Sequence, residues 1–313
     1  MSEAGAAGRF WDREIEAQSH VSWMETPIVR DYINESISPG DPSWPLDWFQ
    51  RAFPGLRFDR ALSIGCGSGA LERDLIRRGL CDRVDAFDGS IASLALARQL
   101  AAAEGQSERI RYFAADFNSP VFPRSRYDAV FFHQSLHHVG KIERLLHAIL
   151  RTLRPEGILY LDEYVGPSRT DWSDRRIRPQ RAAYSRLAKE VRRSEKLPLP
   201  IQPDDPSEAL RSGEIVEQLA IGFRNVEKRG YGGNLLSVLY PAIDWGKGGE
   251  SLLRSLIEEE KEMLGRGEPS FHAIIVAKPR SGVGRFVAGL RYLAEPRPKR
   301  IAYEIRSRLG RLR

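Results

Sequence analysis

Cysteine is scarce in this chain. The 313 residues include only two, Cys66 and Cys81. Two cysteines build neither a disulfide framework nor a cysteine-based zinc cluster, so a reducing compartment fits best. The sequence also lacks an apolar run near the ~18 residues that span a bilayer. Its first residues carry acids early and no apolar central region, unlike a secretory signal. We therefore expect a cytoplasmic protein.

Acidic residues are few in the C-terminal tail. Residues 280–313 hold ten basic side chains and two acidic ones, a net charge of +8. The whole chain carries +6, so the remainder carries −2. The basic character therefore belongs to the tail, and the sequence predicts no nucleic-acid partner. An apolar stripe from Ile301 to Leu312 at helical spacing suits either a peripheral contact with the anionic inner face of a membrane or packing on the domain.

Strand and helix patterns alternate through the middle of the chain. Buried strands are expected at residues 60–65, 83–88, 110–116, 127–135, 158–166, 224–231 and 270–279. Helices are expected at residues 22–37, 70–79, 90–105, 141–157 and 206–223. Alternation of this kind predicts βαβ units, a parallel sheet and an α/β fold.

Three regions follow from this pattern. Residues 1–55, rich in tryptophan and proline, are expected to form a helical lid in which Trp11, Trp23 and Met24 provide apolar contacts, or else to pack on the sheet edge. Residues 56–279 form the main domain, with a charged, proline-rich insert at 166–206 and a helical insert at 235–268. Residues 280–313 are the basic amphipathic tail.

A glycine-rich turn joins the first strand to the first helix of the domain. Its sequence, Gly65-Cys66-Gly67-Ser68-Gly69, lets the backbone turn tightly and lets a ligand approach. No lysine lies between Gly65 and Asp88, and the Gly-Lys-Ser/Thr of a phosphate-binding loop is absent. The turn alone suits a dinucleotide as well as other nucleosides, and it also suits a plain tight turn.

The next two strand ends narrow the choice of cofactor. Asp88 ends the second strand, where a carboxylate can accept hydrogen bonds from both ribose hydroxyls. Asp116 ends the third, where it can accept from an adenine amino group with Phe117 against the ring. The three strand ends therefore predict an adenosine lying across the carboxyl edge of the sheet.

The order and spacing of these motifs resemble the class I S-adenosylmethionine-dependent methyltransferases, over residues 56–165. The stretches LSIGCGSG, DAFDGS, AADF and YDAVFFHQSLHHV carry the resemblance. It implies a Rossmann-like, doubly wound, seven-stranded and mostly parallel sheet, with an antiparallel strand seven between strands five and six. It also implies S-adenosylmethionine as the cofactor. The residues expected to bind it are Gly65, Cys66, Gly67, Gly69, Asp88, Gly89, Ser90, Asp116, Phe117 and His133. One departure is Ser63, where many members carry an acid.

Candidates for acceptor activation end strands four and five. His137, His138 and Glu163 are the predicted catalytic residues, because a hydroxyl acceptor usually needs a general base and histidine titrates near neutral pH. A packing role for His138 and a surface ion pair for Glu163 are the alternatives. No metal is expected, since no dense ligand pattern such as His-Glu-x-x-His occurs.

The leading hypothesis is a methyltransferase that acts on a small-molecule, glycan or lipid-type acceptor, at oxygen. A nicotinamide-dependent oxidoreductase is the rival enzyme, although the sequence offers no third element for a second nucleotide. A catalytically silent, methyltransferase-like subunit that binds a partner is the third possibility. Binding measurements with S-adenosylmethionine and NAD separate the two enzymes.

Overall fold

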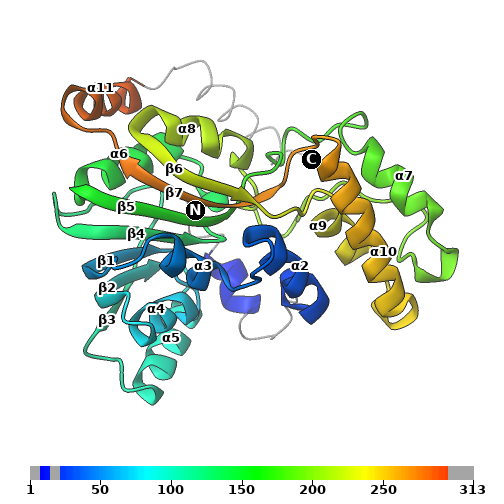
Figure 1. Cartoon of the computed structure of the whole chain (residues 1–313), viewed down its shortest axis with the longest axis horizontal. Coiled ribbons are helices and arrows are strands. Elements are labelled where there is room, and N and C mark those ends of the chain that lie inside the picture. Colours follow the sequence, from blue (N-terminus) through cyan, green and yellow to red (C-terminus); the bar gives the residue numbers. More distant parts are fainter. Residues whose placement is uncertain (1–7, 15–21, 295–313) are drawn as a thin grey trace.

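One seven-stranded sheet organises the protein. The computed structural model describes residues 8–14 and 22–294. The strand order is β3-β2-β1-β4-β5-β7-β6, and β7 runs antiparallel to both of its neighbours. The expected fold, including the place and direction of β7, is confirmed (Figure 1). The strands are β1 (Phe58–Ile64), β2 (Cys81–Asp88), β3 (Ile110–Ala114), β4 (Tyr127–His133), β5 (Leu153–Tyr164), β6 (Phe223–Gly230) and β7 (His272–Pro279).

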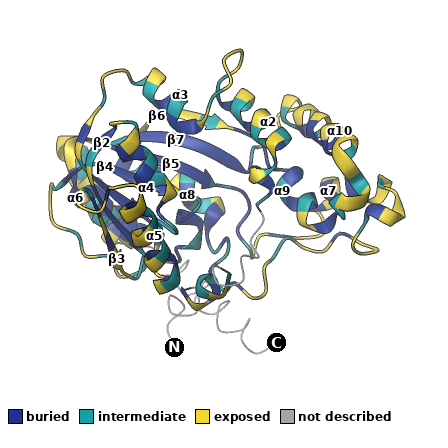
Figure 2. Cartoon of the chain, turned by 90° about the horizontal axis from the view of Figure 1, so that it is seen from below, coloured by how far each residue is buried: buried dark blue, intermediate teal, exposed yellow. Residues whose placement is uncertain are grey.

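Helices cover both faces of this sheet (Figure 1). The two faces belong to different apolar clusters, because side chains alternate along each strand. Ile158 and Tyr160 of β5 join the cluster beneath α3, α4 and α5, whereas Leu159 and Leu161 join the cluster beneath α6, α8 and α11. The bounds of these helices are α3 (Pro45–Ala52), α4 (Ala70–Arg77), α5 (Ile91–Ala103), α6 (Ile142–Thr152), α8 (Ile215–Gly222) and α11 (Gly282–Leu293). In Figure 2 the sheet is mostly buried and the helices are exposed on their outer sides.

Two local predictions need correction. The helix expected at 141–157 ends at Thr152 and Leu153 begins β5, because Pro155 has no N–H for a helical hydrogen bond. The helix expected at 206–223 begins only at Ile215, after the 3-10 turn η4 (Ser212–Glu214). Residues 206–210 form turns instead: Ala209 has a positive φ of 49°, and the N–H of Leu210 donates to the carbonyl of His137.

Most of the N-terminal region packs on the domain. The short turn η1 (Trp23–Glu25) leads into α2 (Pro27–Ile37), and Tyr32 of α2 donates a hydrogen bond of 2.9 Å to Glu260. Glu260 belongs to α10 (Trp245–Gly265), which forms a helical lobe with α7 (Arg178–Arg186), α9 (Leu236–Leu239) and the short η3 (Lys189–Val191) and η5 (Tyr240–Ala242). Among the described residues 8–14 and 22–55, the helical segment 8–14 is the part that lines the predicted cofactor site.

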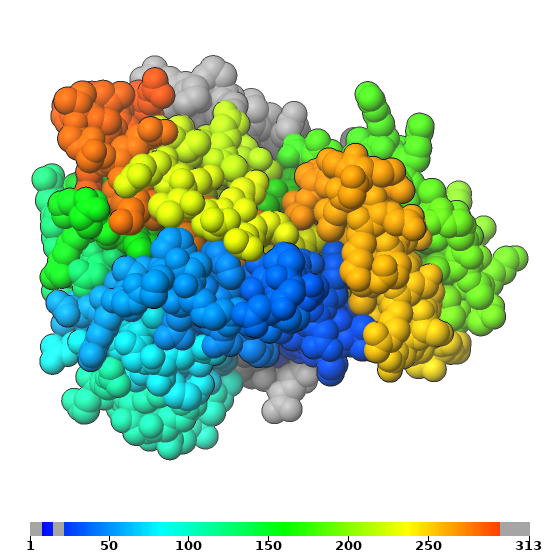
Figure 3. Space-filling model, viewed as in Figure 1, coloured from blue at the N-terminus to red at the C-terminus, as the bar shows by residue number. Residues whose placement is uncertain are grey.

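The C-terminal helix α11 lies at one corner of the molecule, beside α8 (Figure 3). Tyr292 holds it there by donating a 2.7 Å hydrogen bond to the carbonyl of Gln218. The predicted stripe from Ile301 to Leu312 lies outside the described residues. In the part of the chain that the structure describes, every helix is too short or too polar to cross a membrane.

Candidate functional site

The glycine turn lies at the carboxyl edge of the sheet, between β1 and α4. Gly65 and Gly69 both have positive φ, of 73° and 76°. A Cβ at Gly65 would collide with the side chain of Ser135, and one at Gly69 would collide with the hydroxyl of Tyr112. Only glycine fits both positions without strain. The turn therefore approaches the end of β4 more closely than any side chain would permit.

Asp88, at the end of β2, ties this turn to the next one. Its Oδ2 accepts the N–H of Gly67 at 2.9 Å, and its Oδ1 accepts the N–H of Ser90 at 2.8 Å. Burial raises the pKa of Asp88, an effect that these backbone N–H groups oppose. Each oxygen of a carboxylate has more than one lone-pair direction. Asp88 can therefore hold the loop and still accept hydrogen bonds from a ligand.

A cavity of about 350 Å³ opens over these strand ends. Its wall contains most of the residues predicted to bind cofactor: Gly65, Cys66, Gly67, Asp88, Gly89, Asp116, Phe117 and His133. The lining does not include Gly69, Ser90, His137 or Glu163. His138 reaches the wall, with Gln134 and Ser135. The motifs thus converge on one site, and His138 is the predicted catalytic residue that faces it.

Glu72, on the first turn of α4, is a cavity residue that the sequence analysis missed. It lines the cavity and its side chain is fully buried. Among the described residues, neither carboxylate oxygen has a hydrogen-bond partner. Burial raises its pKa to about 7. The departure at Ser63 was the available signal in the sequence. Ser63 carries a short hydroxyl where many members of the family carry an acid, and it lies close enough to Glu72 to lower the pKa of Glu72.

The segment 8–14 closes one side of the cavity. Oδ1 of Asp12 accepts the hydroxyl of Ser90 at 2.7 Å and the N–H of Ala92, in the first turn of α5, at 3.0 Å. Trp11 lines the cavity and meets the ring of His138 edge-on, with centroids 5.8 Å apart. Trp23 packs in the core against His272. Of the three predicted lid residues, Trp11 is the one in the cavity wall.

Glu163 holds the turn that follows β4. Its Oε2 accepts the N–H groups of Ser135 and Leu136 at 3.0 and 2.6 Å. Its Oε1 lies 2.5 Å from Nδ1 of His137, in the 3-10 turn η2 (Leu136–His138). The side chain is fully buried and does not touch the cavity. This geometry makes Glu163 a positioning residue for His137.

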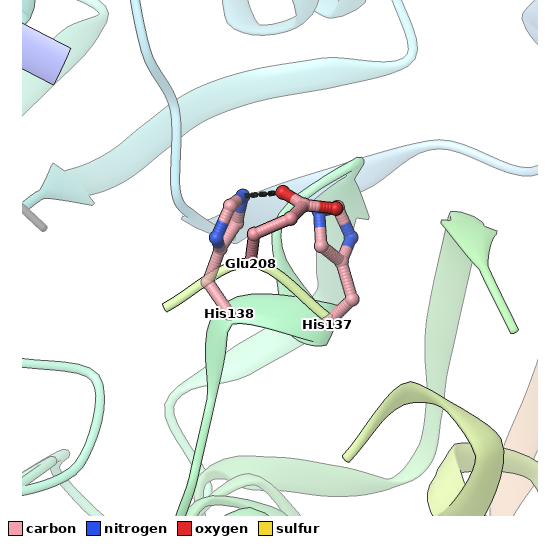
Figure 4. A group of neighbouring side chains, drawn as sticks. All are labelled: His137, His138 and Glu208. Carbon is pink, nitrogen blue, oxygen red and sulfur yellow. Dashed lines mark ion pairs between the residues drawn. The ribbon is translucent and has the colours of Figure 1, made fainter. Parts of the chain in front are cut away.

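The end of the insert and the residues just after it complete the environment of the two histidines. Nδ1 of His138 lies 3.0 Å from the hydroxyl of Ser207, which itself donates to Oδ1 of Asp205 at 2.6 Å. Because the hydroxyl of Ser207 donates its proton to Asp205, the donor in the hydrogen bond between His138 and Ser207 must be Nδ1 of His138. The carboxylate of Glu208 lies between the two imidazole rings (Figure 4). Asp205, Ser207 and Glu208 fall within the helix expected at 206–223 or just before it, so their role was not predicted from the sequence.

The charged groups in this cluster shift one another's pKa values. Burial lowers the pKa of His137, but Glu163 and Glu208 outweigh burial and raise it to about 10. Burial raises the pKa of Glu208, but the neighbouring His137 and His138 lower it to about 2. Burial and the charge of His137 lower the pKa of His138. The neutral, Nδ1-protonated form of His138 therefore carries its lone pair on Nε2.

The sequence comparisons agree with the site. Residues 62–161 match a family described as Methyltransferase domain. A ubiquinone biosynthesis O-methyltransferase from Aeromonas salmonicida (strain A449) is 32% identical over 116 residues, which cover 37% of this chain and 48% of the relative. A sterol 24-C-methyltransferase from Aspergillus fumigatus is 26% identical over 106 residues, covering 34% of this chain and 28% of the relative. The chain thus spans about half or less of the length of these relatives.

The fold has a similar solved structure, that of geranyl diphosphate C-methyltransferase from Streptomyces coelicolor A3(2). The TM-score is 0.54 and the identity 15%, over 90% of this chain and 98% of the other. This likeness concerns the fold. The family match contains the glycine turn, Asp88, Asp116 and the histidine cluster at the end of β4. Residues 62–161 therefore carry a methyltransferase domain of the Rossmann-like, S-adenosylmethionine-dependent type.

Proposed function

We propose that this protein transfers a methyl group from S-adenosylmethionine to an oxygen atom of a small-molecule acceptor. The observation that carries the proposal is the convergence of the glycine turn, Asp88, Asp116 and His138 on one cavity. The first three suit the adenosine part of the cofactor, and the fourth suits an acceptor hydroxyl.

The residues present fit this cofactor. Asp88 has free lone-pair directions for ribose hydroxyls, and Asp116 and Phe117 line the cavity where an adenine would lie. The buried, unpaired carboxylate of Glu72 suits a ligand with positive charge, because a buried carboxylate is costly unless it is paired. When bound, S-adenosylmethionine supplies an electrophilic methyl group on a sulfonium. A dinucleotide would need a site for its second nucleotide, which the pattern of strand ends does not offer.

His138 is the proposed general base. Its ring reaches the cavity, and Ser207 with Asp205 holds the tautomer in which Nε2 has a free lone pair. An acceptor hydroxyl in hydrogen-bond contact with Nε2 loses its proton there as its oxygen attacks the methyl carbon. The resulting imidazolium is stabilised by Glu208, whose Oε2 lies 3.8 Å from Nε2. His137 and Glu163 position the turn.

A lipid-type acceptor is the class that we propose to test first. The relatives named above act on ubiquinone precursors and sterols by their names, and Trp11, Leu71 and Leu210 give this cavity an apolar wall. In addition, α11 exposes an apolar face, at Val283, Phe286, Val287, Leu290 and Leu293. Its occupant, in this proposal, is an anionic membrane surface, because the same helix opens the +8 segment of residues 280–313.

Calorimetry and methyl-transfer assays test the proposal. We expect the full chain to bind S-adenosylmethionine and its demethylated product, and not NAD. With labelled cofactor and a library of phenolic and isoprenoid alcohols, His138→Ala should lower turnover by roughly 10²–10⁴ while cofactor affinity stays unchanged. His147→Ala, in α6 and away from the cavity, is the matched control. Binding of NAD alone would refute the assignment. Cofactor binding without transfer to any acceptor would favour the silent, partner-binding alternative.

A further inference from the structure

Three potential metal ligands meet beside the cavity. Nε2 of His137 and Nε2 of His138 lie 3.6 and 3.8 Å from the same carboxylate oxygen, Oε2 of Glu208. One ligand atom from each of the three residues lies within 4.8 Å of the other two. Figure 4 shows the carboxylate between the two imidazoles. The histidines come from the turn after β4, and Glu208 comes from the turn at 206–210, distant in the sequence, so the fold alone brings them together.

Both imidazoles are oriented from behind. The Nδ1 of His137 contacts Glu163 at 2.5 Å, and the Nδ1 of His138 contacts Ser207 at 3.0 Å, with Asp205 beyond it. Histidines that bind metals are usually held in this way, with one ring nitrogen bonded to a carboxylate or another polar group and the other free for the ion. The two Nε2 atoms are thereby directed toward Glu208.

The two Nε2 atoms lie too far from Oε2 of Glu208 for direct hydrogen bonds. Their separations from this oxygen are 3.6 and 3.8 Å. Ligands bound at about 2.0–2.1 Å to one tetrahedral ion lie about 3.3 Å apart. Glu208 lies in a turn, and 27% of its side chain is exposed, so it can move the few tenths of an ångström needed to share an ion with the histidines.

The surrounding charge favours a cation. The carboxylates of Glu163, Asp205 and Glu208 surround the two rings. Arg169, which donates to the backbone carbonyl of Asp205, is a nearby positive group. Oδ2 of Asp205 has no hydrogen-bond partner in the described structure. A divalent ion would compensate this negative charge at the point where the three ligand atoms meet.

We propose that His137, His138 and Glu208 bind a divalent transition-metal ion at the wall of the cofactor cavity. Two imidazoles and one carboxylate favour ions such as Zn²⁺, Mn²⁺ or Fe²⁺ over Mg²⁺, which prefers oxygen ligands. His138 lines the cavity, so a coordination position of the ion that no protein ligand occupies would face the acceptor. The absence of a metal expected from the sequence is therefore revised in this proposal.

The role of the ion rests on the proposed function. The lone pair that makes His138 a base is used as a ligand when the ion is bound. An acceptor hydroxyl on the open position then loses its proton to water, because a bound cation lowers the pKa of an oxygen ligand. That oxygen forms the bond to the methyl carbon, the carbon–sulfur bond breaks, and its electron pair stays on sulfur.

Metal binding is tested independently of turnover. Untagged full-length protein is stripped with a chelator and titrated with Zn²⁺, Mn²⁺ and Mg²⁺ by calorimetry, and with Co²⁺ by visible absorption. We expect one Zn²⁺ or Co²⁺ per chain and much weaker binding of Mg²⁺. His138→Ala and Glu208→Gln should each weaken binding at least 100-fold, and Ser207→Ala, behind the ligand, by roughly 10–100-fold. His147→Ala and Glu217→Gln, outside the cluster, should leave it unchanged.

Two results would overturn the metal site. One is no stoichiometric binding of Zn²⁺, Mn²⁺ or Co²⁺ by a protein that still binds S-adenosylhomocysteine. The other is metal binding that persists in both ligand variants. Circular dichroism and S-adenosylhomocysteine binding show whether each variant is folded. If metal binding fails while methyl transfer proceeds, the proposed function stands with His138 as the base. If metal binds and no acceptor is methylated, the metal site stands and the proposed function fails.

Discussion

Oδ2 of Asp88 accepts the backbone N–H of Gly67 at 2.9 Å, so the end of β2 holds the glycine turn that follows β1. The same carboxylate is expected to bind the ribose. Asp88→Ala should therefore weaken S-adenosylmethionine binding by ~1.5–3 kcal/mol for the lost charged hydrogen bonds, with some loosening of the turn. Calorimetry measures the affinity. Asp82→Ala, in the exposed part of β2, is the control, and equal affinities in the two folded variants would contradict the assignment.

The cofactor half of the site was readable from sequence because it is local. Each of Gly65, Asp88 and Asp116 lies at or just after the end of a strand, and parallel strands bring their carboxyl ends to one edge of the sheet. Strand order alone then places these residues around a common cavity. The prediction needed no knowledge of side-chain packing.

The other half depends on contacts between distant segments. Glu208 reaches His137 because residues 206–210 leave the helical path that their apolar spacing predicts, and a positive φ at Ala209 has no signature in an alanine. Asp12 caps α5 from 80 residues away. Glu72 is buried on α4, although a charged side chain is ordinarily expected at an exposed position. In each case tertiary structure overrides a local preference.

Glu72 makes the free protein sensitive to pH. Burial raises its pKa to about 7 in the folded state, against about 4.3 for an unperturbed glutamate. The folded state thus binds more protons between these values, and stability falls as pH rises from about 4.3 to about 7. Each pKa unit corresponds to 1.36 kcal/mol, so the loss is at most ~3–4 kcal/mol. Glu72→Gln should remove it, and urea unfolding at pH 5, 6, 7 and 8 measures this.

Binding of a cationic cofactor should offset the loss of stability that the buried carboxylate of Glu72 causes. Glu72→Gln should therefore lose affinity for S-adenosylmethionine, most strongly above pH 7, although it is more stable without ligand. Glu108→Gln, on an exposed loop, should change neither property. A variant that is destabilised at pH 8, or that binds the cofactor as well as the original protein there, would show that Glu72 does not face the ligand as a free carboxylate.

Asp12 should hold the segment 8–14 on the domain. Its carboxylate accepts hydrogen bonds from Ser90 and Ala92, so Asp12→Ala should release the segment without disturbing the sheet. Limited trypsin digestion measures this as faster cleavage after Arg13, and cofactor should protect the original protein more than the variant. Asp31→Ala, exposed on α2, is the matched control. Unchanged cleavage and unchanged cofactor affinity in Asp12→Ala would argue against a lid.

The exposed face of α11 should bind anionic membranes. Ala288 and Tyr292 pack on the domain and leave Phe286 and Leu290 exposed, at 67% and 51%. Each nearby basic residue adds about 1 kcal/mol at an anionic surface, and salt screens this attraction over ~10 Å at 0.1 M. Vesicles containing phosphatidylserine should therefore sediment the full chain at low salt and release it as salt rises. The double variant Phe286→Ser/Leu290→Ser should bind more weakly, while Trp44→Ser, an exposed apolar residue before α3 on the opposite face of the sheet, should not. Binding that ignores both salt and the double variant would assign α11 a structural role.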